Sequence, residues 1–193
     1  MTATLAMLIS GIFFAFVHSS VKYLPHLPAH EIVFFRSIVS CVITYFALRS
    51  LKISPWGNNK KMLVLRGLAG TCALLLYFHT LQSMPLASAV TIQYLHPIFT
   101  VVLAGILLKE KPRWWQWGFF ALSFVGVLMV ESFDTRVVPF DATLGVLSAL
   151  FSATAYTLIR HLKNEDHPLV VVFYLPMVSL VITGPMTAMD WVM

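Results

Sequence analysis

The sequence predicts an all-α polytopic membrane protein with about seven transmembrane helices. Hydrophobic residues make up 59% of the 193 residues and charged residues only 11%, whereas a soluble domain has roughly 45–50% and about 25%. The apolar residues form long runs, and most charged residues lie between them. Each run is close to the ~20 residues that an α-helix needs to cross about 30 Å of hydrocarbon. The runs cover residues 2–21, 31–48, 62–82, 87–108, 114–130, 142–159 and 169–188.

The first run, residues 2–21, is interpreted as a retained span rather than a cleaved signal peptide. No Lys or Arg precedes it, and it is longer than the core of about 7–15 residues that is usual in a signal peptide. Pro25 and Pro28 precede the second run, and the turn-forming segment 54–59 precedes the third. No alternation of period two passes through these segments, which favours helices over the strands of a membrane barrel.

Prolines also bound the later runs. Pro85 precedes the fourth run, Pro112 precedes the fifth, and Pro139 and Pro168 precede the sixth and seventh. The fifth run begins with three tryptophans beside the basic residues of the preceding connection, which is typical of an aromatic belt at the membrane surface.

Lys and Arg are distributed unevenly between the connections, which predicts the orientation of the chain. The connections after the second, fourth and sixth runs hold nine of these residues, and the other three hold two. Because cytoplasmic loops carry the excess, we expect a cytoplasmic amino terminus, in the cell (inner) membrane. The bias explains the formal charge of +5, so no nucleic-acid partner is expected. The nine are Arg49, Lys52, Lys60, Lys61, Lys109, Lys111, Arg113, Arg160 and Lys163, and the two are Lys22 and Arg136.

The sixth and seventh runs resemble the first and second, which indicates an internal repeat. Residues 10–24 align without gaps with residues 148–162, and residues 33–44 align with residues 172–183. A chance match between apolar helices is the alternative, but two consecutive helices match in the same order.

A repeat unit of five helices would be inverted in its second copy, because five is an odd number. Inverted repeats are a feature of many secondary transporters. We expect a complete first repeat in residues 1–135 and the first two helices of a second repeat in residues 140–193. The last three helices of that second repeat are then expected to be missing from this chain.

Several short motifs run along the first repeat in a fixed order. They are His30-Glu31-Ile32-Val33-Phe34-Phe35-Arg36, Leu65-Arg66-Gly67-Leu68-Ala69-Gly70, Met84-Pro85-Leu86-Ala87-Ser88-Ala89, His96-Pro97-Ile98-Phe99 and Leu107-Leu108-Lys109-Glu110, followed by Gly118 and Gly126. As an ordered set they resemble the EamA-type family of the drug/metabolite transporter superfamily. The resemblance implies ten helices in two five-helix repeats and transport of a small organic metabolite.

Polar groups are costly inside a bilayer, so the polar residues of these runs are candidates for a substrate site. Pro97 lacks an N–H, so we expect the carbonyl of Gln93 to be a bare acceptor beside the side chains of Gln93 and His96. His18 and Tyr156 occupy equivalent positions of the repeat and are expected to face the same cavity. The alternatives are a simple proline kink with His96 bonded to a neighbouring helix, and buried side chains with one satisfied hydrogen bond.

Four polar residues of the second and third runs are further candidates for the site. Tyr77 could stack or hydrogen-bond within a cavity, or it could anchor its helix at the membrane interface. His79 is two residues away and faces elsewhere. Arg36 could attract an anionic group or pair with Glu31. Arg66 lies close to a predicted membrane edge, so we expect it to reach the surface in a structural role. The predicted substrate-binding residues are therefore His18, Arg36, Tyr77, Gln93, His96 and Tyr156.

We interpret the chain as a secondary transporter of small organic metabolites, working by alternating access between two inverted repeats. Proton coupling is a further hypothesis, since His18 and His96 can titrate near neutral pH, and a homodimer is another. The alternatives are a non-transporting membrane subunit, an inactive fragment and a membrane-embedded enzyme. No catalytic residues or cofactor are expected, because the sequence contains no Gly-x-Ser-x-Gly, no His-Glu-x-x-His and no paired intramembrane carboxylates. No metal is expected either, because His26 and His30 have ligand spacing but lie in a proline-containing loop without an acidic or cysteine ligand.

Overall fold

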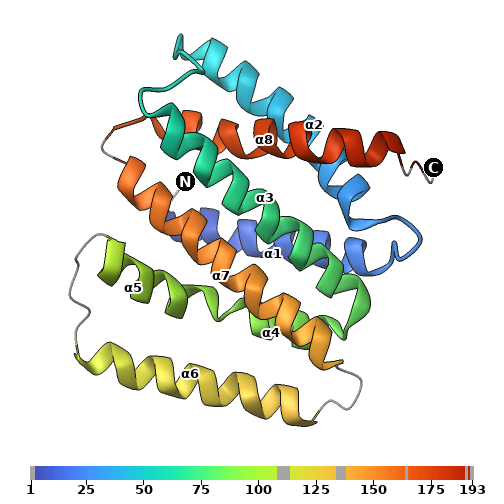
Figure 1. The fold of residues 1–193 in the computed structure, drawn as a ribbon. Helices are drawn as coiled ribbons and strands as arrows, with labels where there is room; N and C mark the ends of the chain where they lie inside the picture. The colour runs from blue at the N-terminus through green and yellow to red at the C-terminus, as the bar shows by residue number, and fades with distance from the viewer. Residues whose placement is uncertain (1–2, 108–113, 134–137, 164, 190, 192–193) are drawn as a thin grey trace.

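The computed structural model describes residues 3–107, 114–133, 138–163, 165–189 and Trp191. The predicted connection with Lys109, Lys111 and Arg113, and the residue Arg136, lie outside these ranges. Within them the chain is all-helical, which confirms the predicted fold class (Figure 1). The helices are α1 (Ala3–Lys22), α2 (Ala29–Ser50), α3 (Lys60–Ser83), α4 (Leu86–Gln93), α5 (His96–Leu107), α6 (Trp114–Phe133), α7 (Pro139–Leu162) and α8 (Pro168–Met189).

Six segments of the described chain are long and apolar enough to cross a membrane. One of them, Leu86–Leu107, combines α4 and α5, and the others correspond to α1, α2, α3, α7 and α8. They coincide with six of the seven predicted runs, so the chain is a polytopic membrane protein. Helix α6 occupies the predicted run at residues 114–130, and its role as a seventh span stays a prediction.

Helix α3 lies at the centre of the arrangement and packs along α7 and α8. In Figure 1, α3 and α7 run side by side through the middle, with α2 and α8 on one side and α4, α5 and α6 on the other. Helix α2 packs along α8, and α4 and α5 pack along α7. One apolar cluster joins α3 to α4 and α7 through Phe78, Leu81, Ile92 and Ala149. A second apolar cluster joins the end of α2, the start of α3, the end of α7 and the start of α8.

Gly67 allows α3 to approach α8 closely. A Cβ atom added at Gly67 would lie 2.6 Å from Cγ2 of Val178 and 3.0 Å from the backbone carbonyl oxygen of Tyr174. Four residues further along α3, the hydroxyls of Thr71 and Ser179 lie 2.8 Å apart and are fully buried. The absence of a side chain at Gly67 thus lets α3 pack closely against α8.

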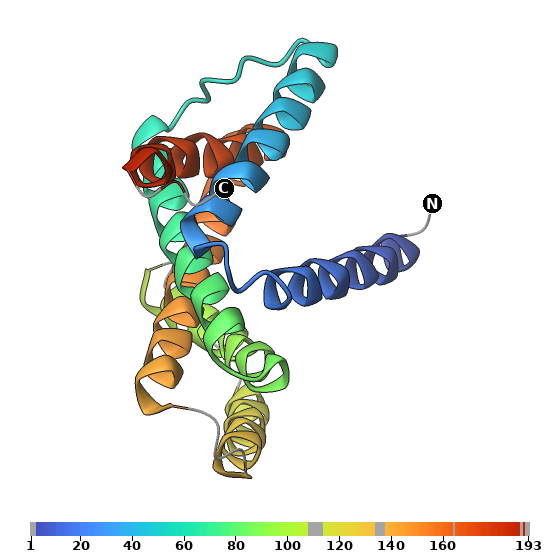
Figure 2. The same cartoon turned by 90° about the vertical axis from the view of Figure 1, so that its right-hand side faces the viewer.

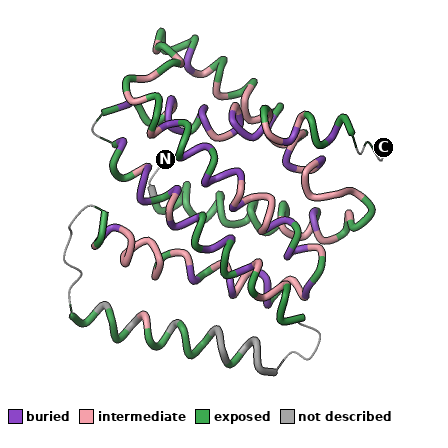
Figure 3. The backbone as a smooth tube through the Cα atoms, in the orientation of Figure 1, coloured by how far each residue is buried: buried purple, intermediate pink, exposed green. Residues whose placement is uncertain are grey.

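Helix α1 projects away from the other helices and presents most of its apolar side chains at the surface (Figures 2 and 3). Of its described side chains, Val21 alone is buried. Its carboxyl end is fixed to the end of α3, where the Lys22 ammonium donates to the carbonyls of Gln82 at 3.1 Å and Met84 at 2.7 Å. The Gln82 amide in turn donates to the carbonyls of Leu24 and Leu27. Exposed apolar helix surface of this kind suits lipid as the surrounding solvent.

Two connections that are far apart in sequence meet at one end of the molecule. The carboxylate of Asp166 accepts hydrogen bonds from the backbone N–H groups of Asn58 at 2.5 Å and Asn59 at 3.2 Å. The side chain of Asn59 donates to the Glu165 carboxylate at 2.8 Å, and the Tyr174 hydroxyl donates to the Trp56 carbonyl at 2.8 Å. We call the contacts of Asn58 and Asn59 with Glu165 and Asp166 the polar clamp.

Candidate binding cavity

A cavity of about 630 Å³ lies between α1, α3, α4 and α7, with smaller contributions from α2, α5 and α8. All six residues that the sequence predicted for a substrate site line it, each from a different helix. They are His18 of α1, Arg36 of α2, Tyr77 of α3, Gln93 of α4, His96 of α5 and Tyr156 of α7. The volume lies within the range of about 300–1,000 Å³ that is usual for sites of small organic ligands.

His18 and Tyr77 form one pair on the cavity wall. The Tyr77 hydroxyl oxygen lies 3.4 Å from Nε2 of His18. The two rings meet edge to face, with 5.3 Å between their centroids and 87° between their planes. This contact joins the projecting helix α1 to the central helix α3 at the level of the cavity.

The break between α4 and α5 differs from the prediction in one respect. Pro97 does interrupt the helix, because α4 ends at Gln93 and α5 begins at His96. The Gln93 carbonyl is not bare, however, because Nδ1 of His96 lies 2.8 Å from it. A carbonyl oxygen can only accept, so Nδ1 carries the hydrogen, and Nε2 of a neutral His96 is left as an acceptor.

His96 also stacks on Tyr156 of α7, with ring centroids 5.2 Å apart and an angle of 27° between the planes. His96 of α5 thus contacts the end of α4 through a hydrogen bond and contacts α7 through an aromatic stack. The Tyr156 side chain is half exposed, so one flat aromatic surface remains open beside the cavity.

The Gln93 side chain is held by α7 on both sides of its amide. Its nitrogen donates to the Ser152 hydroxyl at 2.8 Å, and its oxygen accepts from the Ser148 hydroxyl at 3.1 Å. The Ser148 hydroxyl also lies 2.9 Å from the Ala73 carbonyl, so it contacts α3 as well. Gln93 thus fixes α4 to α7, in addition to lining the cavity. Ser152 lines the cavity too and was missed, although it lies four residues before Tyr156 on the same face of α7.

Two arginines line the cavity. The guanidinium carbon of Arg36 lies 5.8 Å from the centre of the Phe78 ring. Arg66 of α3 also lines the cavity, and its side chain is only 7% exposed. The expectation that Arg66 reaches the membrane surface is therefore wrong. It shares a face of α3 with Gly70, Ala73 and Tyr77, and this helical spacing is the signal that could have placed it in the cavity.

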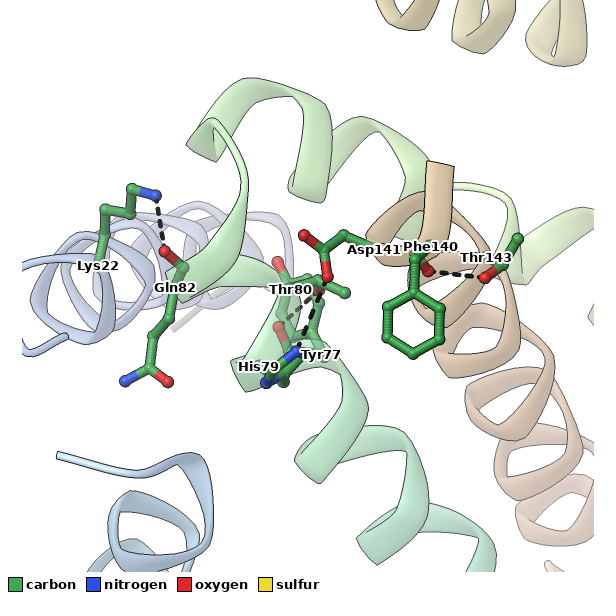
Figure 4. A network of polar contacts seen from close by, with 8 residues as sticks. All are labelled: Lys22, Tyr77, His79, Thr80, Gln82, Phe140, Asp141 and Thr143. Carbon is green, nitrogen blue, oxygen red and sulfur yellow. Dashed lines mark hydrogen bonds and ion pairs between the residues drawn. The ribbon is translucent and has the colours of Figure 1, made fainter. Parts of the chain in front are cut away.

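His79 lies outside the cavity, as its spacing from Tyr77 indicated. Its side chain is 52% exposed, and its Nε2 lies 3.8 Å from an Asp141 carboxylate oxygen at the start of α7 (Figure 4). His26 and His30 belong to no cluster either, since no three His, Cys, Asp or Glu side chains come together as metal ligands in the described part of the chain.

Residues 1–132 match the model of the EamA-like transporter family. The pseudopaline exporter CntI of Pseudomonas aeruginosa is 31% identical over 167 residues, which cover 86% of this chain and 59% of the exporter. Solute carrier family 35 member G1 of Homo sapiens is 29% identical over 186 residues, covering 86% and 50%. The S-adenosylmethionine uptake transporter of Rickettsia prowazekii is 24% identical over 178 residues, covering 89% and 59%. The chain thus spans between a half and three-fifths of these relatives, and no solved structure matches it.

Proposed function

Because the chain belongs to the EamA-like transporter family, we propose that it acts as a secondary transporter of small organic metabolites. The observation that carries this proposal is the cavity of about 630 Å³, on which polar side chains from six helices converge inside an otherwise apolar bundle. Polar side chains at such depth are costly and mark solute pathways. Relatives named for export of pseudopaline and for uptake of S-adenosylmethionine agree with a small organic solute.

Alternating access between two inverted repeats is the mechanism that we propose for it. The cavity is lined by α1 to α5 from the predicted first repeat and by α7 and α8 from the predicted second repeat. A site between two repeats is exposed to one side or the other when one repeat rocks against its partner. Helix α2 also packs along α8, which is its equivalent in the predicted repeat.

Cysteine labelling tests this mechanism without knowledge of the substrate. In a background with Cys41→Ser and Cys72→Ser, Ala155→Cys places a thiol on the cavity wall. Alternating access predicts that a membrane-impermeant maleimide labels this thiol both from outside and from inside sealed vesicles. The matched control is Ala153→Cys, two residues away on α7 and fully buried outside the cavity lining, which should stay unlabelled. Labelling of Ala155→Cys from one side alone would contradict the mechanism and favour a non-transporting subunit.

We also propose that transport is coupled to protons. A homodimer is a separate part of the proposal, which the following experiment does not address. His18 and His96 line the cavity, and histidine is the residue type that most often serves as a proton carrier in proteins. A pH gradient across the vesicles is then expected to change the ratio of inside to outside labelling of Ala155→Cys. Replacing both side chains, as His18→Gln with His96→Gln, should abolish the change. If the labelling ratio does not change with the pH gradient, the histidines do not couple protons to the conformational equilibrium.

A further inference from the structure

The cavity carries fixed positive charge without negative charge on its wall. Arg36 and Arg66 both line it, and none of the described lining residues is Asp or Glu. A guanidinium cannot be deprotonated in a protein, so each arginine keeps its charge. Positive charge held in a concave, apolar site attracts an anionic ligand, because the field is focused there and poorly screened.

Of the two arginines, Arg66 gives the stronger evidence for an anionic ligand. Its side chain is 7% exposed, and neither Nε nor Nη1 has a hydrogen-bond partner in the described part of the chain. Leaving these two donors of a buried guanidinium unpaired is expensive, and an anion that enters the cavity would remove part of that cost. The planar guanidinium presents paired N–H donors that match the two oxygens of a carboxylate or the oxygens of a phosphate. One turn further along α3, a Cβ atom added at Gly70 would lie 2.5 Å from Cδ1 of Leu175 and 3.9 Å from Nη1 of Arg66, so Leu175 of α8 packs beside this guanidinium.

The other residues that line the cavity indicate what the non-anionic part of the ligand is like. Phe14, Leu74 and Leu175 are apolar, and the stacked rings of His96 and Tyr156 offer a flat aromatic surface. An inorganic anion would leave this surface unused, whereas an organic acid with an apolar or aromatic body would cover it.

We propose that the cavity selects small organic anions with an apolar body, and that Arg66, assisted by Arg36, binds the anionic group. This inference rests on the proposed transport function, of which it names the substrate class. Arg66 is here a specificity-determining residue, which adds to the six predicted site residues.

Matched pairs of neutral and anionic probes test the charge selection. The chain is purified into phosphatidylcholine nanodiscs, and binding is measured by calorimetry for indole-3-acetate, benzoate and hexanoate and for the corresponding amides. We expect at least one carboxylate to bind at least tenfold more tightly than its amide. If no carboxylate binds more tightly than its amide, the proposal is overturned. Inorganic phosphate serves as a probe of the anionic group alone and should bind more weakly than the preferred carboxylate.

Substitutions assign the selectivity to the arginines. Arg66→Gln is expected to weaken carboxylate binding at least tenfold while binding of the amide stays within twofold. Arg66→Lys keeps the positive charge but loses the paired N–H donors of the guanidinium, so it should give an intermediate loss of carboxylate affinity. It replaces Arg66→Gln as the test variant if Arg66→Gln does not fold. Arg49→Gln, at the exposed end of α2 and outside the cavity, is the matched control and should bind like the parent chain. Unchanged carboxylate binding in folded Arg66→Gln and Arg36→Gln variants would overturn the assignment.

A lipid headgroup is the other source of an anionic group. Repeating the calorimetry in nanodiscs that contain phosphatidylglycerol separates the two, because a headgroup that occupies the cavity would abolish carboxylate binding. That result would overturn the selection of soluble organic anions. The two proposals can also fail separately: two-sided labelling of Ala155→Cys with no preference for carboxylates would refute only the charge selection. One-sided labelling with a clear preference would refute only alternating access.

Discussion

Gln93 shows how one residue can serve both the architecture and the site. Its amide oxygen and nitrogen are bonded to Ser148 and Ser152, and its backbone carbonyl lies 2.8 Å from the His96 ring. All of these bonds lie at the level where Pro97 breaks the helix. The residue therefore holds the end of α4 against α7 and leaves the His96 ring fixed beside the cavity.

Gln93→Met should measure the structural part of this role. Methionine has a similar length but makes neither bond to α7, so we expect the free energy of unfolding to fall by roughly 1–3 kcal/mol for the two lost interhelical bonds. The apparent melting temperature in detergent measures the loss. Thr91→Val is the control, because the Thr91 hydroxyl bonds to the Ala87 carbonyl of its own helix and its removal should change little. Equal melting temperatures of the Gln93→Met chain and the parent would refute the structural role.

The sequence predicted six residues that all line the cavity, although their contact with a substrate stays a prediction. Polarity within an apolar run selected them, since a polar side chain there must face other helices, but the same criterion left out Ser152. It could not predict that the His96 ring would bind the Gln93 carbonyl, because that depends on a side-chain rotamer. The distance of Arg66 from a predicted membrane edge does not predict its position, because the helix face decides it. The face is set by its neighbours Gly70 and Tyr77, which also line the cavity.

At the scale of helices, the contact of α3 with α8 depends on the absence of a side chain at Gly67. Gly67→Ala would bring a methyl group to 2.6 Å from a Val178 carbon and 3.0 Å from the Tyr174 carbonyl oxygen. The carbonyl belongs to the backbone of α8, so relief requires a shift of the helix. Overpacking of this kind costs about 1–3 kcal/mol, and we expect a lower melting temperature in detergent.

Gly118→Ala in α6 provides the matched control for this substitution. No described atom lies within 4 Å of a Cβ built at Gly118. Alanine is favoured over glycine in a helix by up to about 1 kcal/mol, so the melting temperature should be unchanged or higher. If the two substitutions had equal effects, close packing at Gly67 would not explain the small residues at 67–70.

Hydropathy predicted where the helices lie, but not how the helices respond to their prolines. The run at residues 87–108 is divided into α4 and α5 next to Pro97, whereas α8 continues through Pro176 and Pro185. A proline removes one N–H in either case. Neighbouring helices and side chains decide whether the freed groups are satisfied without a break, and the sequence of one run does not contain those partners.

For the whole molecule, the uneven distribution of Lys and Arg makes a prediction about orientation that the fold leaves open. Ser50 ends α2 and Ser83 ends α3, and both side chains are exposed. With Cys41 and Cys72 replaced, Ser83→Cys should react with an impermeant maleimide in intact cells. Ser50→Cys should react only after the membrane is permeabilised. The reverse pattern would place the amino terminus outside and contradict the prediction from the basic connections.

The polar clamp joins the connection between α2 and α3 to the connection between α7 and α8, two of the connections predicted to be cytoplasmic. It therefore links the two predicted repeats at one face of the molecule. Asp166 is 7% exposed and accepts two backbone N–H groups with its carboxylate, and hydrogen bonds to a charged group are worth about 1.5–3 kcal/mol each. In an alternating-access transporter, such a contact stabilises the state that is closed on its own side.

Asp166→Ala should then do more than lower stability. Removal of the carboxylate leaves the N–H groups of Asn58 and Asn59 without their acceptor, so the melting temperature should fall. The equilibrium should also shift towards opening at the clamp, which predicts faster labelling of Ala155→Cys from that side and slower labelling from the other. Glu165→Gln is the control, because it retains an oxygen that can accept from Asn59 in an exposed contact, and both labelling rates should stay unchanged. A fall in melting temperature with unaltered labelling from both sides would make the clamp a structural contact only, without influence on access to the cavity.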